Sequence, residues 1–165
     1  MTAEQISEYL LSHSQFFERD VIYDTDRRGE SFCELIIKNS SLPSYPITVT
    51  ATEDGCYVSV GNFANVTGSK KMTPEQTLAA IEDIMADKII FVLGYRDGDD
   101  IGFGSPVFSR IFALTGGEDD MSEEYEEFIR TINKPINKML RPLHSLKGRF
   151  LIFNFSGDVN QTVIR

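Results

Sequence analysis

An unbroken run of five apolar residues, Ile89 to Leu93, places the strongest single limit on how this chain folds. A strand with one face in water alternates apolar and polar side chains, whereas a strand covered on both faces is apolar throughout. Residues 88–96 therefore predict a central strand that is covered on both sides. The run is also far shorter than the roughly 20 apolar residues that a membrane-spanning helix needs.

Size and charge exclude several classes of protein. The chain has 165 residues, of which 41% are hydrophobic, so it is too apolar for a disordered chain and suits one folded domain spanning 1–165. Its formal net charge of −9 disfavours binding to a nucleic-acid backbone. No Lys or Arg precedes Arg19, so the basic start of a secretory signal is missing. We expect a cytoplasmic location and no membrane contact.

Three segments have the apolar spacing and the end signals of helices. Thr2 and Gln5 fit a capping box ahead of an apolar stripe that ends at Phe17. A second helix is predicted from the sequence of residues 73–76, which combines an N-cap, a proline and a capping-box glutamine, to about residue 87. A third begins near Ser122 and keeps helical spacing to Leu143, with Pro135 expected to kink or split it.

Residues 47–60 predict a β-hairpin. Asp54-Gly55 is typical of a two-residue type I′ turn, which would place Thr52 opposite Tyr57. This alignment predicts one apolar face and one face rich in hydroxyl groups. The apolar face consists of Val49, Ala51, Val58 and Val60, and the other of Thr48, Thr50, Thr52, Tyr57 and Ser59.

Further strands are predicted around the hairpin and near the end of the chain. They cover residues 21–24, 31–38, 149–155 and 161–165, with a turn at 156–158 joining the last two. Residues 106–115 are ambiguous, because their apolar spacing fits a helix, which we favour, and also a strand. The order of elements predicts an α+β fold: a mostly antiparallel sheet with three or four helices packed on it, as a two-layer or three-layer sandwich.

No motif with strong chemical specificity occurs in the sequence. Cys33 and Cys56 are expected on the inward faces of their strands as buried, reduced thiols, with a bridge between neighbouring strands as the alternative. The glycines at 102 and 104 lack the third glycine of a dinucleotide fingerprint, and two Asp-x-Asp segments depart from the calcium-loop pattern. We therefore assign no catalytic residue, metal or cofactor, and a protein without enzymatic activity is favoured.

The charges are distributed unevenly along the chain. Between residues 97 and 127 there are ten acidic residues and one basic residue, Arg110, whereas after 133 there are six basic residues and one acidic residue. One interpretation is a solvated loop followed by a helix whose end charges match its dipole. The other is an acidic face that binds a basic protein. Its predicted contact residues are Glu118, Asp119, Asp120, Met121, Glu123, Glu124 and Tyr125.

The leading hypothesis is a small protein-binding module that uses this acidic face. The size, the acidic balance and the order of elements resemble those of class I secretion chaperones and of small immunity proteins, so a chaperone-like or immunity-like role is implied. The likeness is architectural, and it transfers no site residue. An alternative is a small-molecule-binding or enzymatic domain with a pocket between the sheet and the last helix, near Tyr57, Tyr95 and His144. A homodimer through an open sheet edge or the hydroxyl-rich face is a third hypothesis.

Overall fold

The computed structural model divides the chain into two compact units, Met1–Met85 and Ala86–Arg165. It describes residues 1–25, 29, 31–61, 64–67, 70–96, 106–114, 116–117, 120–133 and 148–164, and for 18–25 it describes the backbone alone. Two antiparallel sheets and three helices make up this part of the chain, which confirms the α+β class. None of these helices has the length and apolar character needed to cross a membrane. Folding as a single domain stays a prediction.

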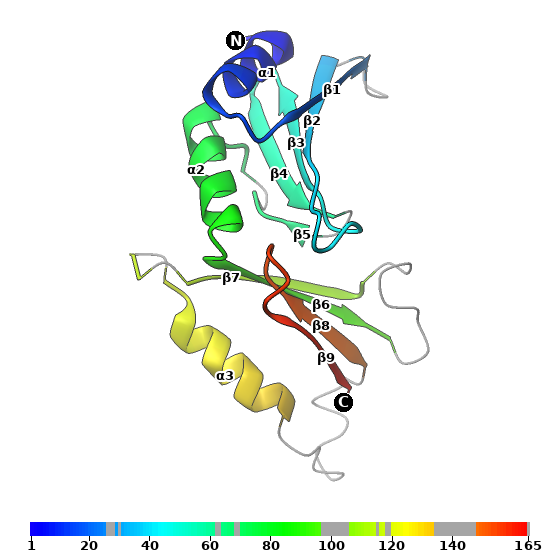
Figure 1. Cartoon of the computed structure of the whole chain (residues 1–165), viewed down its shortest axis with the longest axis vertical. Coiled ribbons are helices and arrows are strands. Elements are labelled where there is room, and N and C mark those ends of the chain that lie inside the picture. The colour runs from blue at the N-terminus through cyan, green and yellow to red at the C-terminus, as the bar shows by residue number, and fades with distance from the viewer. Residues whose placement is uncertain are drawn as a thin grey trace. The chain divides into compact units, whose positions relative to one another are not determined.

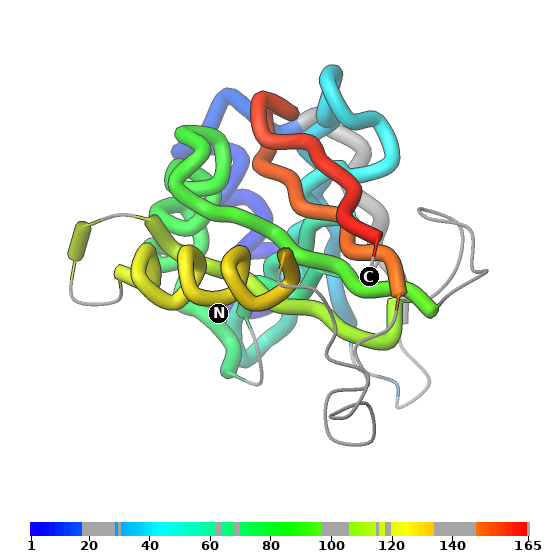
Figure 2. The backbone as a smooth tube through the Cα atoms, turned by 90° about the horizontal axis from the view of Figure 1, so that it is seen from below, coloured from blue at the N-terminus to red at the C-terminus, as the bar shows by residue number. Residues whose placement is uncertain are grey.

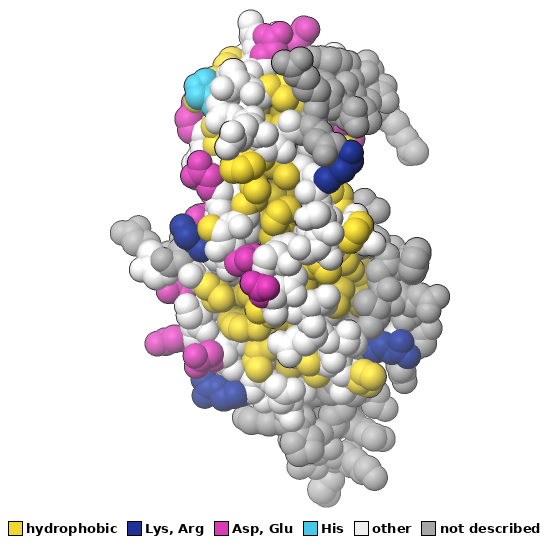
Figure 3. All heavy atoms as spheres, in the orientation of Figure 1, with side chains coloured by type: hydrophobic (Ala, Val, Ile, Leu, Met, Phe, Trp, Pro, Cys, Tyr) yellow, Lys and Arg dark blue, Asp and Glu magenta, His cyan; other side chains and the backbone are white. Residues whose placement is uncertain are grey.

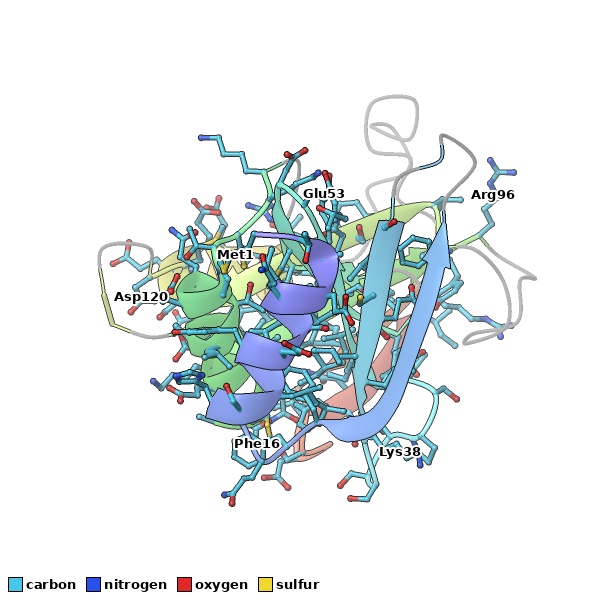
Figure 4. The ribbon with its side chains drawn as sticks, turned by 90° about the horizontal axis from the view of Figure 1, so that it is seen from above. Met1, Phe16, Lys38, Glu53, Arg96 and Asp120 are labelled. Atoms are coloured by element: carbon cyan, nitrogen blue, oxygen red, sulfur yellow. The ribbon has the colours of Figure 1, made fainter. Side chains whose placement is uncertain are left out.

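The first unit is a five-stranded antiparallel sheet with two helices on one face (Figure 1). The strands are ordered as in the sequence, β1-β2-β3-β4-β5. Helix α1 contacts β2 and β3, α2 contacts β4, and the two helices contact each other (Figure 4). The elements are α1 Ala3–His13, β1 Glu18–Thr25, β2 Ser31–Ile37, β3 Ile47–Thr52, β4 Gly55–Val60, β5 Ala64–Asn65 and α2 Pro74–Met85.

The core of the first unit lies between the helices and the sheet. Side chains along β2 and β3 alternate between buried and half-buried, which is the pattern of a sheet with one covered face. The buried set confirms the apolar face predicted for the hairpin, and the hydroxyl-rich face is half-buried. The fully buried apolar side chains of the sheet include Leu35, Ile47, Val49, Ala51, Val58 and Val60.

Both helix starts of the first unit follow the prediction. The Thr2 hydroxyl accepts a hydrogen bond from the Gln5 N–H, and the Gln5 side chain accepts one from the Thr2 N–H. Thr73 and Gln76 make the same reciprocal pair at the start of α2. Each box gives partners to backbone N–H groups that the helix itself cannot satisfy.

The predicted register of the hairpin is wrong by two residues. Thr52 lies opposite Gly55, so Glu53 and Asp54 form the turn. Gly55 has a φ of 132°, and a Cβ there would lie 2.7 Å from the Met72 carbonyl oxygen, so this position needs glycine. A type I′ turn requires positive φ at both central residues, and among the described non-glycine residues only Asp87 has one. The faces were predicted correctly because a shift of two residues preserves them.

The second unit is a four-stranded antiparallel sheet in the order β7-β6-β8-β9. Helix α3 contacts β7 and packs on one face of this sheet (Figures 1 and 2). Every residue of β6 is buried, and β6 is paired on both edges, as the apolar run predicts. The elements are β6 Ile89–Tyr95, β7 Phe108–Ala113, α3 Ser122–Asn133, β8 Arg149–Phe153 and β9 Asn160–Ile164.

Aromatic side chains fill the space between α3 and this sheet. Phe128 of α3 lies with its ring centroid 5.6 Å from that of Phe112 and 6.1 Å from that of Phe150. Gly94 of β6 allows this packing, because a Cβ there would approach the Phe108 Cβ to 3.1 Å and the Phe150 ring to 3.2 Å. The buried members of the cluster are Ile90, Val92, Phe112, Phe128, Ile132, Phe150 and Ile152.

Within residues 106–115 the sequence favours a helix, and the structure shows a strand instead. Phe108–Ala113 form strand β7, with Phe112 opposite Ile90 and Arg110 opposite Val92. The spacing of apolar residues fits both structures, and pairing with the buried edge of β6 decides for the strand. Helix α3 is described from Ser122 to Asn133, and the predicted break at Pro135 lies outside the described residues. The remainder of the predicted helix lies outside the described residues.

Candidate functional site

The exposed side of α3 carries a polar hollow. Helical spacing puts residues 123, 127 and 130 on one side, away from the buried Phe128 and Ile132. The hollow has a volume of about 440 Å³ and opens to solvent. Acidic and basic side chains are visible together on this part of the surface in Figure 3. The lining residues are Glu123, Glu126, Glu127, Arg130 and Thr131.

Two of the four glutamates on α3 are neutralised by arginines. Glu124 accepts a hydrogen bond of 2.6 Å from the Arg110 guanidinium of β7, and that guanidinium also lies 4.8 Å from the centre of the Phe112 ring. Glu126 lies 3.9 Å from Arg130, one turn further along the helix. Glu123 and Glu127 form no ion pair in the described part of the chain. Among the described residues, these two carboxylates of α3 are therefore the ones without an opposite charge beside them.

Asp120 has a local structural role at the start of α3. Its carboxylate accepts hydrogen bonds from the Ser122 hydroxyl and from the Ser122 N–H, the latter at 2.8 Å. These bonds lower the pKa of Asp120 below its ordinary value of 3.8. Asp120 is labelled in Figure 4, where it lies in the loop ahead of the helix. A carboxylate at this end also suits the helix dipole.

The two predicted anchor residues are engaged in the core. Met121 and Tyr125 are half-buried and pack against the aromatic cluster, with the Tyr125 ring 5.3 Å from that of Phe112. Burial raises the pKa of Tyr125 above 10.0, and a hydrogen bond with the Gln161 side chain partly offsets that shift. A role for these two residues in binding stays a prediction. Glu118 and Asp119 lie outside the described residues.

The structure adds residues that the prediction of contacts did not include. Glu126, Glu127 and Arg130 line the hollow together with Glu123. They follow Glu123 by three, four and seven residues, which is the spacing of one helix face. Their grouping could therefore have been predicted from the sequence. The contact of Arg110 with Glu124 could not be predicted in this way, because it depends on β7 being a strand beside α3.

The two cysteines are buried, free thiols. Cys33 and Cys56 both flank Ala51 on the helix-covered face, but they belong to β2 and β4. Two strand spacings separate their Cα atoms by roughly 10 Å, beyond the reach of a disulfide. Burial raises the pKa of both thiols, and hydrogen bonds with Ser7 and Thr77 only partly offset it. Raised pKa values disfavour the reactive thiolate.

The predicted pocket near Tyr57, Tyr95 and His144 stays a prediction, because these residues belong to different units or lie outside the described residues. Tyr57 lies on the hydroxyl-rich face of β4 in the first unit, where the Lys71 ammonium lies 5.5 Å from its ring centre. Tyr95 ends β6 in the second unit, and His144 lies outside the described residues. The Tyr95 hydroxyl and the Nε of Arg149, the residue opposite Tyr95 on β8, are buried and have no hydrogen-bond partner among the described residues.

The described residues contain no cluster of three or more side chains suited to a metal ion. A second hollow, of about 230 Å³, lies beside the hairpin turn and is lined by Gly29, Ser31, Thr52, Glu53 and Asp54. The Asp54 carboxylate there pairs with Lys71 at 3.1 Å.

Comparisons of the chain with protein-family models, with curated proteins and with solved structures found no match.

Proposed function

We propose that this chain is a protein-binding module, chaperone-like or immunity-like, that binds a basic partner through the acidic side of α3 and the residues before it. The observation that carries the proposal is the pair Glu123 and Glu127, two carboxylates that line one hollow and form no ion pair among the described residues. The wider surface includes Asp120 and Glu124, and the sequence adds Glu118 and Asp119.

The arrangement supports electrostatic recognition. Exposed charges attract a partner of opposite sign over about 8 Å at physiological salt, which speeds the encounter more than it strengthens the complex. Glu124 and Glu126 are already paired with arginines, so they contribute less attraction. The uneven charge along the sequence adds to the effect, since ten of the 25 acidic residues fall between 97 and 127.

Affinity capture from the native cell tests the proposal. The bait is the wild-type chain, compared with the double variant Glu123→Lys/Glu127→Lys. We expect the wild type to retain a specific protein at low salt, to retain less at high salt, and the variant to retain at least tenfold less. The captured protein is then purified, and its association rate with each bait is measured, because charge steering acts on that rate.

A matched control separates this site from total charge. Glu8 on α1 and Glu82 on α2 are exposed helical glutamates in the first unit. The variant Glu8→Lys/Glu82→Lys changes the net charge equally and should bind like the wild type. Equal loss of binding in both double variants, or capture that ignores salt and charge reversal, would remove the acidic side of α3 as the binding surface.

We propose a small-molecule site as the second candidate, supported by the buried donors of Tyr95 and Arg149, which have no partner in the part of the chain that the structure describes. Buried polar atoms almost always have hydrogen-bond partners, so a ligand with acceptor oxygens would suit this pair. The test is thermal unfolding with a panel of small carboxylates and phosphates. We expect one of them to raise the Tm of the wild type but not that of Tyr95→Phe. An unchanged Tm throughout the panel would discard this candidate.

A further inference from the structure

In the described part of the chain, the two sheets have four edge strands, β1 and β5 in the first and β7 and β9 in the second. An edge strand presents unpaired backbone N–H and C=O groups, which can pair with a strand of another molecule. Proteins that stay apart block such edges with charge, proline, irregular register or short length. The four edges differ sharply in these features.

Three of the edges carry a recognised block. Strand β1 contains four charged residues in its sequence, and its register is irregular between Glu18 and Ile22. Strand β5 has only two residues. Strand β7 has the exposed Arg110 near its centre, held there by Glu124. Each of these edges is a poor template for a further strand.

The edge of β9 carries none of these features. Its sequence, Asn160–Ile164, has no charge and no proline, and its register with β8 is continuous from one end to the other. Four of its five residues are exposed, and the Ile164 side chain is 72% exposed. In an antiparallel sheet, the backbone groups of successive residues point alternately to the two neighbours. About half of those in β9 therefore point away from β8.

We propose that β9 is a homodimer interface, at which β9 of a second copy pairs antiparallel with it and joins the two four-stranded sheets into one. A two-fold axis at Thr162 lets the same five residues supply both sides of the interface. Thr162 then faces Thr162 of the second copy, a favourable cross-strand pair, and Ile164 faces Asn160 of that copy. The proposal does not depend on the acidic surface of α3.

Charge complementarity favours a second copy in this orientation. Asp158 is exposed just before β9, while Arg149 of β8 lies opposite Ile164 at the other end. Antiparallel pairing brings Asp158 of each copy toward that end of β9 in the other copy at which Arg149 lies on the neighbouring strand. A parallel arrangement would instead bring the two Asp158 carboxylates together. The strand between them is neutral, so no like charges face each other along the interface.

Light scattering across a range of protein concentrations tests the proposal. The wild-type mass should rise toward that of two chains, a twofold change, whereas Thr162→Lys should remain at one chain at every concentration. Ser109→Lys puts the same charge at an exposed position on β7 and should dimerise like the wild type. A wild-type chain that remains a monomer throughout would overturn the proposal, as would dimers of Thr162→Lys or equal weakening by both lysines.

A cross-linking experiment keeps the test sound if the lysine variant misfolds. Both native thiols are buried, so an introduced surface cysteine is the reactive one. Thr162→Cys should form a disulfide-linked dimer under mild oxidation at least tenfold faster than Ser109→Cys. Equal rates for the two variants would show random collision rather than pairing along β9, and would also overturn the proposal.

Discussion

The two sheets of this protein reach burial by different means. In the first unit, β2 and β3 alternate between buried and half-buried residues, and two helices cover one face. In the second unit, each residue of β6 is buried, and one helix with an aromatic cluster covers one face. The difference teaches that alternation reports a single covered face, while an unbroken apolar run reports a strand whose residues are all buried.

Truncation of the aromatic cluster should have the largest effect. Phe112→Ala removes a fully buried ring that contacts Phe128 and Tyr125, and should lower the free energy of unfolding by about 3–5 kcal/mol. Urea unfolding measures the loss. Val107→Ala, at a side chain that is 57% exposed, serves as the control and should stay within about 0.5 kcal/mol. Similar losses at both positions would contradict a core centred on this cluster.

Exchanging hydroxyl and methyl groups tests whether the sheet of the first unit has a single covered face. Val49→Thr buries a hydroxyl with no partner and should cost about 1–3 kcal/mol of unfolding free energy. Thr50→Val, on the opposite face, should change it by less than about 0.5 kcal/mol. In the second unit, Val92→Thr should be as costly as Val49→Thr. The comparison fails if Thr50→Val proves as damaging as Val49→Thr in urea unfolding.

The helix starts offer a smaller contrast. Thr73→Ala removes the hydroxyl that accepts from the Gln76 N–H, and should destabilise the protein by about 1 kcal/mol. Thermal unfolding followed by circular dichroism measures it. Thr131→Ala, at an exposed position within α3, is the control and should be nearly neutral. An equal loss at both positions would show that capping by the Thr73 hydroxyl is not its cause.

Asp120→Asn should have the smallest effect, and one that depends on pH. The pKa of Asp120 is lowered in the folded chain, so its carboxylate stabilises the fold above the unfolded pKa, and this contribution is lost as pH falls through the folded pKa. The wild type should therefore exceed the variant in stability at pH 7, and the two should converge below the ordinary value of 3.8. Urea unfolding of both chains at neutral and at acidic pH measures the difference, and a difference that stays constant with pH would contradict this role of the Asp120 carboxylate.

Much of the local structure is predictable from residues close together in the sequence. Both capping boxes depend on residues three positions apart, and the apolar run of β6 depends only on its own composition. The separation of the hairpin faces follows from alternation alone. The hairpin register was missed because Gly55 lies against the Met72 carbonyl, a contact from a distant segment. The acidic side chains of α3 were predicted in part, and the pairing of Arg110 with Glu124 was not.

The sequence by itself determined which residues alternate, which are apolar throughout, where helices begin and where the acidic residues concentrate. Short-range sterics, capping and periodicity act within a few residues, so they can be read along the chain. Tertiary structure decided that residues 108–113 are a strand, that the strands form two sheets, and that β9 lies at the edge of one of them. These outcomes depend on which strand lies beside which, and that choice rests on hydrogen bonds and packing between residues far apart in the sequence.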